Sequence, residues 1–98
     1  MKTIDFKSGE ITYNELHIDF SLPFSEQEKS LTEDLLLVEY ENGYMIDLGW
    51  YPEFDEKGKF VLQLINNGNW EKPIYKKKSR KWTHIRKALL KAIDIAHE

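Results

Sequence analysis

The dipeptide Asn42-Gly43 constrains the fold of this chain more than any other feature. It separates two β-prone runs, residues 35–41 and residues 44–50. Asn-Gly between such runs is a strong signal for a β-hairpin, because a type I′ turn needs positive φ at both central positions. A two-residue turn here predicts that Leu37 lies opposite Leu48. Neither face of the hairpin is purely polar, which indicates a central place in a sheet.

The rest of the chain predicts more strands and one helix. Residues 11–20 alternate near their end as in a half-buried strand, with Leu16, Ile18 and Phe20 on one side. We also expect a short strand within 3–6, a loop at 21–33 with one helical turn at 25–29, a strand at 59–65, a turn at 66–69, a short edge strand within 70–75 and a helix at 79–97.

The helix is predicted from apolar residues spaced three and four apart, with Ser79 as its N-cap. The stripe consists of Trp82, Ile85, Leu89, Ala92, Ile93 and Ala96. Short connections favour antiparallel neighbours. The sequence therefore predicts one α+β domain over residues 1–98. Its sheet is an antiparallel meander of four to five strands, and the C-terminal amphipathic helix packs on one face.

Composition argues against several classes of protein. The 98 residues include no cysteine, so thiol chemistry and cysteine-based metal sites are excluded. The three histidines lack the spacing of a metal clip, and nucleophile motifs and phosphate-binding glycine loops are absent. We therefore expect no catalysis, no cofactor and no metal site. No apolar run is long enough for a membrane span or a signal peptide, so we expect a cytoplasmic protein.

Charge is distributed unevenly along the chain. Residues 1–56 hold 14 acidic and 3 basic side chains, whereas residues 57–98 hold 3 acidic and 11 basic ones. The net charges are therefore −11 and +8. The acidic half favours a basic protein partner through long-range steering, and it disfavours direct binding of nucleic acid. Candidate partner-binding residues are Glu39, Glu41, Asp47, Trp50, Tyr51, Glu53, Asp55 and Glu56.

The basic half contains a run of cations at residues 76–81. An alternative anion-binding site would consist of Lys76, Lys77, Lys78, Arg80 and Lys81. If the helix begins at Ser79, these cations crowd its N-terminus, where the helix dipole disfavours positive charge. Two interpretations are open: the run meets an anion or an acidic partner, or it pairs with the acidic half of the same chain or is simply solvated.

The second half of the chain resembles small immunity proteins of bacterial contact-dependent growth-inhibition and polymorphic-toxin systems. The resemblance consists of Asp-x-Gly-Trp-Tyr-Pro-Glu at residues 47–53, Gly58, Asn-Trp-x-x-Pro at residues 69–73 and a lysine-rich C-terminal helix. It implies a small cytoplasmic protein without enzymatic activity that binds and blocks a cognate toxin domain, frequently a nuclease with a basic cleft. The positive C-terminal half departs from an all-acidic pattern.

We therefore expect a binding protein that neutralises a toxin, a nuclease domain above all, by occluding its active site or its substrate-binding surface. The alternative is a nucleic-acid-associated regulator that binds phosphates through residues 76–81. No membrane partner is expected. The sequence leaves open the partner's identity, the face that binds it and the oligomeric state.

Overall fold

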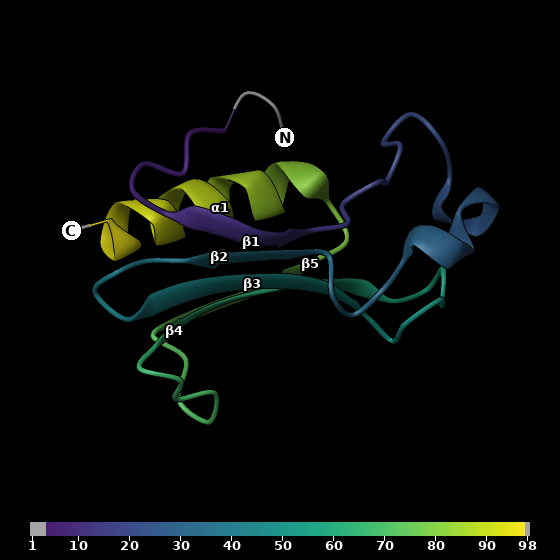
Figure 1. Cartoon of the computed structure of the whole chain (residues 1–98). Helices are drawn as coiled ribbons and strands as arrows, with labels where there is room; N and C mark the ends of the chain where they lie inside the picture. The colour runs from purple at the N-terminus through teal and green to yellow at the C-terminus, as the bar shows by residue number, and fades with distance from the viewer. Residues whose placement is uncertain (1–3, 98) are drawn as a thin grey trace.

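The computed structural model describes residues 4–97, and it confirms the α+β prediction. Five antiparallel strands follow one another across an open sheet in the order β1-β2-β3-β4-β5, and one helix packs along one face (Figure 1). The elements are β1 (Glu10–Asn14), β2 (Leu36–Glu39), β3 (Tyr44–Tyr51), β4 (Lys59–Asn66), β5 (Tyr75–Ser79) and α1 (Trp82–Ala96), with short 3₁₀ turns at Phe24–Glu26 and Glu28–Ser30.

The predicted β2–β3 hairpin is present, but its predicted register is wrong by one residue. Leu37 pairs with Asp47 instead of Leu48. The backbone N–H of Gly43 donates to the carbonyl of Tyr40 at 3.1 Å, and Tyr40 N–H donates to the carbonyl of Tyr44 at 2.9 Å. The loop thus has three residues, and only Gly43 has positive φ, at +92°. A turn followed by a left-handed glycine is the next most common hairpin solution after the two-residue turn.

The first third of the chain contains less strand than predicted. Strand β1 ends at Asn14, and residues 16–20 are irregular. Ile18 is nevertheless buried and Leu16 packs against the core, whereas Phe20 is largely exposed. The alternation therefore identified two residues that face the core without a strand. The loop at 21–33 is confirmed, with its predicted helical turn present as two 3₁₀ turns. Residues 4–6 form no strand, and residue 3 lies outside the described residues.

The basic run forms strand β5, which corrects the predicted strand within 70–75 and the predicted helix start. The helix begins at Trp82 with Lys81 at the N-cap position, and no side chain caps it. Ser79 ends β5, where its hydroxyl accepts a hydrogen bond of 3.0 Å from Lys81 N–H. The lysines at 76–78 therefore alternate between the two faces of an edge strand instead of crowding one helix end.

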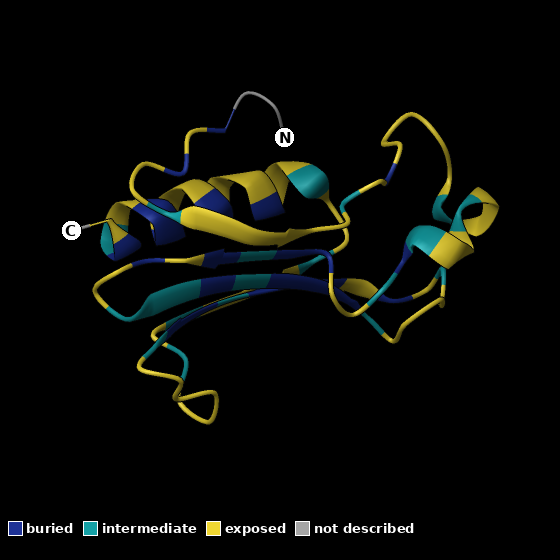
Figure 2. Cartoon of the chain, viewed as in Figure 1, coloured by how far each residue is buried: buried dark blue, intermediate teal, exposed yellow. Residues whose placement is uncertain are grey.

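The hydrophobic core lies between the sheet and α1 (Figure 2). The predicted apolar stripe of the helix is confirmed, since all its members except the half-buried Trp82 are buried. The sheet contributes alternate residues, which are Leu36, Val38, Ile46, Leu48, Trp50, Phe60, Leu62 and Leu64. The residues between them form the opposite face of the sheet, which no helix covers. We call it the open face.

An aromatic cluster closes one end of the core. Trp50 and Phe60 stand edge to face with ring centroids 4.9 Å apart, and Phe24 lies 4.5 Å from Trp50. The guanidinium of Arg80 lies 5.3 Å from the centroid of the Phe24 ring and donates a hydrogen bond to the carbonyl of Gly58. This cluster joins the loop after β1 to the loop after β3.

Candidate functional site

One row of paired residues crosses the open face from edge to edge. Tyr13 of β1 pairs with Leu37, Leu37 with Asp47, Asp47 with Gln63, and Gln63 with Lys76 of β5. Because paired residues in a sheet point to the same side, these five side chains share one surface. The row begins with an aromatic residue, has a carboxylate at its centre and ends with a cation.

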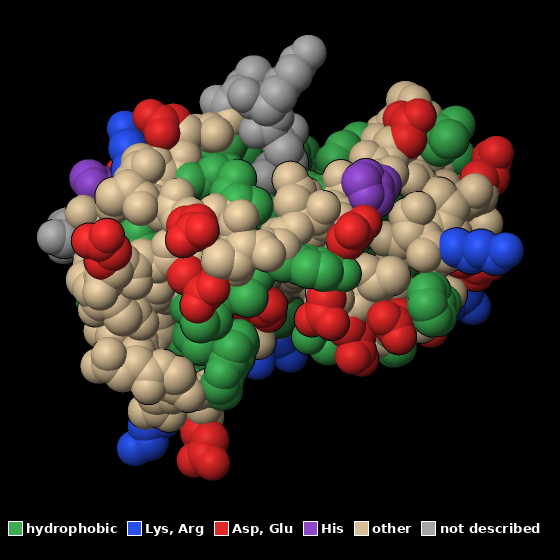
Figure 3. Space-filling model, viewed as in Figure 1, with side chains coloured by type: hydrophobic (Ala, Val, Ile, Leu, Met, Phe, Trp, Pro, Cys, Tyr) green, Lys and Arg blue, Asp and Glu red, His purple; other side chains and the backbone are tan. Residues whose placement is uncertain are grey.

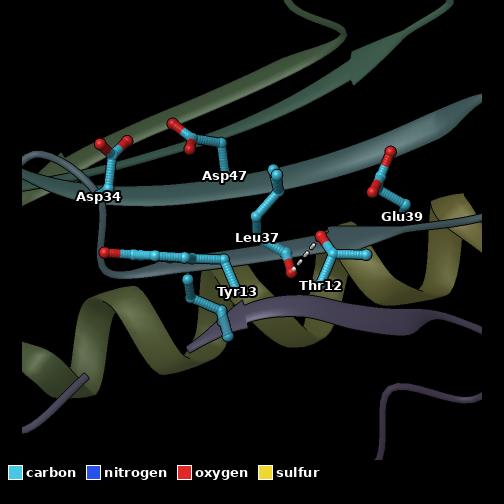
Figure 4. A pocket seen from close by; sticks show the side chains of 7 residues that line it. Thr12, Tyr13, Asp34, Leu37, Glu39 and Asp47 are labelled. Atoms are coloured by element: carbon cyan, nitrogen blue, oxygen red, sulfur yellow. Dashed lines mark hydrogen bonds between the residues drawn. The ribbon is translucent and has the colours of Figure 1, made fainter. Parts of the chain in front are cut away.

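A depression of about 460 Å³ lies at the β1 side of this face (Figure 4). Its lining residues are Thr12, Tyr13, Asp34, Leu36, Leu37, Glu39 and Asp47. The hydroxyl of Thr12 donates a 3.4 Å hydrogen bond to the carbonyl of Leu37. Tyr13 is 42% exposed. The depression thus combines exposed aromatic surface with three carboxylates.

Asp47 occupies an unfavourable position for a carboxylate. Its side chain is half-buried, and burial raises its pKa from 3.8 to about 6, with the neighbouring charge of Asp34 adding to the increase. Within residues 4–97, its carboxylate forms no hydrogen bond and no ion pair. A carboxylate that is desolvated without a partner costs stability, so its position is not explained by folding alone.

A second depression adjoins the first, and the two share Tyr13 and Asp34. Its lining residues are Tyr13, Glu15, His17, Lys29, Ser30, Thr32, Asp34 and Glu53. His17 Nε2 lies 2.8 Å from Glu15 Oε2. Together the depressions form a continuous surface, which we call the acidic surface. In the view of Figure 3, carboxylates alternate with apolar side chains over this part of the molecule.

The fold brings only some of the predicted partner-binding residues together. Glu39 and Asp47 line the first depression, and Glu53 lines the second. Tyr51 lies in a separate depression with Lys59 and Lys78. Glu41 lies in the β2–β3 turn, and Glu56 lines a depression beside Phe24 and Arg80. Asp55 binds within its own loop, because its carboxylate accepts a 2.8 Å hydrogen bond from Lys57 N–H.

Trp50 must be removed from the predicted partner contacts. Its side chain is fully buried, and its indole N–H donates a 2.7 Å hydrogen bond to the carbonyl of Asp55. The physical reason is that Trp50 lies on the helix side of β3, where Phe24 and Phe60 pack against it. Of the aromatic residues in residues 50–54, Tyr51 is half-buried and Phe54 is exposed.

Sequence reasoning missed Thr12, Tyr13 and Leu37, and it did not select Asp34 from the acidic run. Tyr13 reaches the surface because β1 pairs with β2, with an irregularity between Ile11 and Tyr13 that resets the register. Nothing local in the sequence encodes that bulge. Leu37 resembled a core residue because it lies in an apolar run, and only the true hairpin register places it on the open face.

The predicted anion-binding run is split by the fold. Lys76 and Lys78 pair with residues of the open face, and Lys77 pairs with Leu62 on the helix side. Arg80 is engaged with Phe24, Trp50 and Gly58. The five cations of residues 76–81 therefore do not form one patch.

Pairing between the two halves of the chain does not explain the charge split. Among residues 4–97, the ion pairs within 4.0 Å are Lys7 with Asp5 at 3.7 Å and His17 with Glu15 at 2.8 Å. Both are local and join residues two positions apart. No cation of the basic run approaches a carboxylate of the described residues within that distance. Within residues 4–97, the two kinds of charge therefore lie on the surface without ion pairs between the halves of the chain.

No protein-family model matches this sequence, no curated protein matches it, and no solved structure matches its fold. The only helix longer than one turn in residues 4–97 is too short and too polar to cross a membrane. Within the same residues, no three side chains of His, Asp or Glu are grouped to hold a metal ion.

Proposed function

We propose that this chain is an immunity protein that binds a cognate toxin domain. In this proposal the toxin domain is a basic nuclease. The immunity protein neutralises it by occluding its active site or its substrate-binding surface. The acidic surface is the contact in this proposal, and the chain performs no catalysis. The observation that carries the proposal is Asp47: a half-buried carboxylate, beside Asp34, without a cation in the described chain.

A basic partner would supply what Asp47 lacks. A Lys or Arg side chain placed over the depression beside Asp47 would also be attracted by Asp34, whose charge already acts on Asp47. Charge-assisted hydrogen bonds of this kind are stronger than neutral ones, and desolvation at an interface strengthens them further. In the free protein the desolvated carboxylate of Asp47 lowers the stability of the fold, and a bound cation would stabilise it. Residues at binding surfaces commonly reduce stability in this way for the sake of function.

The acidic surface also offers apolar contact. The exposed ring of Tyr13 lies in both depressions, and Leu37 forms part of the floor between the carboxylates. Tyrosine is enriched among the residues that dominate interface energies. The charge of −11 on residues 1–56 would increase the association rate with a basic domain, and this effect falls as salt is added.

Co-expression with the product of the adjacent open reading frame tests the proposal. We expect the two proteins to copurify and the toxicity of the neighbour to be suppressed. The double variant Asp34→Asn with Asp47→Asn should weaken the complex by tenfold or more, since each buried charged contact is worth about 1.5–3 kcal/mol. The matched control is Glu41→Gln with Glu56→Gln, which removes the same charge outside the acidic surface.

Two results would overturn the proposal. One is the absence of any association together with unchanged toxicity. The other is equal weakening by the acidic-surface variant and its control, because binding would then depend on net charge alone. The complex should also weaken as pH falls through about 6, where Asp47 becomes protonated.

A further inference from the structure

A second charged surface lies between β5 and α1, on the helix side of the sheet. It is a depression of about 200 Å³ lined by Tyr75, Lys77, His84, Lys87, Ala88 and Lys91. We call it the cationic groove. The strand supplies Tyr75 and Lys77, and the helix supplies the rest. No carboxylate lines the groove, and within residues 4–97 none of its lysines forms an ion pair.

This gathering of cations has an energetic cost. Lys87 and Lys91 are four positions apart on the helix, where like charges repel. Lys81 occupies the N-cap of the same helix, where the dipole disfavours a cation. Asp94 lies three positions after Lys91 on the same helix, but within residues 4–97 no ion pair within 4.0 Å offsets the cost.

From this geometry we propose that the cationic groove binds the phosphate groups of an extended polyanion, either a phosphodiester backbone or a free polyphosphate chain. Lysine ammonium groups are point charges suited to phosphate oxygens. Lys81, His84, Lys87 and Lys91 follow one another along the helix at intervals of three or four residues. They span ten residues, or about 15 Å at 1.5 Å per residue, which is longer than a single phosphate group.

The contacts around the groove favour phosphate recognition over base recognition. The ammonium of Lys91 lies 5.0 Å from the centroid of the Tyr75 ring, so this aromatic face is already covered by a cation. His84 Nδ1 lies 3.1 Å from the hydroxyl of Ser79, which leaves Nε2 as the ring nitrogen for a ligand. Binding should therefore be independent of base sequence and sensitive to salt.

The test is a titration of the whole protein with a short labelled single-stranded RNA, repeated with inorganic tripolyphosphate as ligand and as competitor. The logarithm of the binding constant should fall linearly with the logarithm of the salt concentration. Three lysines predict a slope of about −2 for a single strand, from about −0.7 per phosphate contact. The variant Lys77→Gln with Lys91→Gln should reduce this slope to about −0.7. The control Lys59→Gln with Lys72→Gln removes the same charge elsewhere and should leave the slope unchanged. Thermal unfolding of both variants verifies that they fold.

The outcomes separate the sources of the ligand. Binding of RNA with competition by tripolyphosphate supports a groove for a phosphodiester backbone, and binding of tripolyphosphate alone supports one for free polyphosphate. The proposal is wrong if neither RNA nor tripolyphosphate binds at low salt. It is also wrong if the control variant loses as much affinity as the groove variant, or if poly-glutamate competes as well as tripolyphosphate. It does not depend on the toxin partner, and copurification of that partner with the groove variant should be unaffected.

Discussion

Asp34 and Asp47 lie on the same depression of the open face, and the charge of Asp34 helps to raise the pKa of Asp47 to about 6. Figure 4 shows both carboxylates on the same side of the sheet, with Asp47 on β3 and Asp34 in the segment just before β2. Two like charges in a partly desolvated position oppose each other in the free protein. This relationship makes the stability of the fold depend on pH in a defined window.

The variant Asp47→Asn should be more stable than the wild type at neutral pH. The pKa of Asp47 is 3.8 in the unfolded reference and about 6 in the fold, so the folded state binds the extra proton between these values. Wild-type stability should therefore fall as pH rises from about 4 to about 6, and remain lower above that. After discounting for partial exposure, we expect a gain of about 1–2 kcal/mol for the variant at pH 7.

Urea unfolding from pH 4 to pH 8 measures this difference. The advantage of Asp47→Asn should vanish near pH 4. Glu41→Gln, in the exposed turn, serves as the control and should track the wild type within about 0.5 kcal/mol. A variant less stable than the wild type at pH 7 would show that the carboxylate has a stabilising partner.

The variant Arg80→Lys should destabilise the protein although it keeps the charge. The planar guanidinium lies over Phe24 and near Trp50 while donating to the Gly58 carbonyl, and an ammonium cannot reproduce both contacts. We expect a loss of about 1–2 kcal/mol in the free energy of unfolding. Lys76→Gln on β5, the strand that precedes Arg80, is the control, with an effect below about 0.5 kcal/mol. Wild-type stability in Arg80→Lys would refute this structural role.

The variant Gly49→Ala should cost about 2–3 kcal/mol, because a Cβ at Gly49 would lie 2.0 Å from the backbone oxygen of Glu33. That oxygen cannot move without displacing the chain that enters β2. Gly68→Ala is the matched control, since a Cβ there meets nothing within 4 Å and the cost comes from φ of +72° alone, about 1 kcal/mol. Thermal unfolding of both variants should give this order, and the reverse order would contradict the close approach.

The variant Tyr40→Phe should loosen the segment before β1. The Tyr40 hydroxyl donates a buried 2.9 Å hydrogen bond to the carbonyl of Phe6, and burial, with a smaller effect of Asp5, raises the pKa of Tyr40 to about 12. The Tyr40 hydroxyl therefore stays protonated at every pH at which the protein is studied. Removing it should cost about 1–1.5 kcal/mol. Hydrogen exchange should increase at Gly9, whose N–H binds the Phe6 carbonyl, and not at Tyr44.

The fold class was predictable because its signals are local. The Asn42-Gly43 turn marks the hairpin, and the helix follows from apolar spacing alone. The hairpin register was not predictable, because Asn-Gly fits both a two-residue turn and a three-residue loop, and the choice of loop changes the face of every residue in β2. Strand β5 was misplaced because a run of lysines has low β propensity, and pairing with β4 overrides it.

The sequence predicted that acidic residues form the candidate site, but it did not predict which of them lie together in space. Glu39, Asp47 and Glu53 were selected from the acidic half of the sequence. Tyr13 lies beside them only because β1 pairs with β2, and this pairing joins residues more than twenty positions apart. Trp50 was misassigned because exposure depends on distant partners, here Phe24 and Phe60.

The lysines of β5 have a consequence for the solution behaviour of the sheet. An unprotected edge strand is a template on which another chain can add a strand, and charged side chains, lysine above all, discourage such growth. Two copies of β5 would bring three lysines against three, while the irregular pairing of β1 shortens the template at the opposite edge. These features disfavour the addition of a sixth strand at either edge, and neutralising Lys76, Lys77 and Lys78 would remove this protection at the β5 edge.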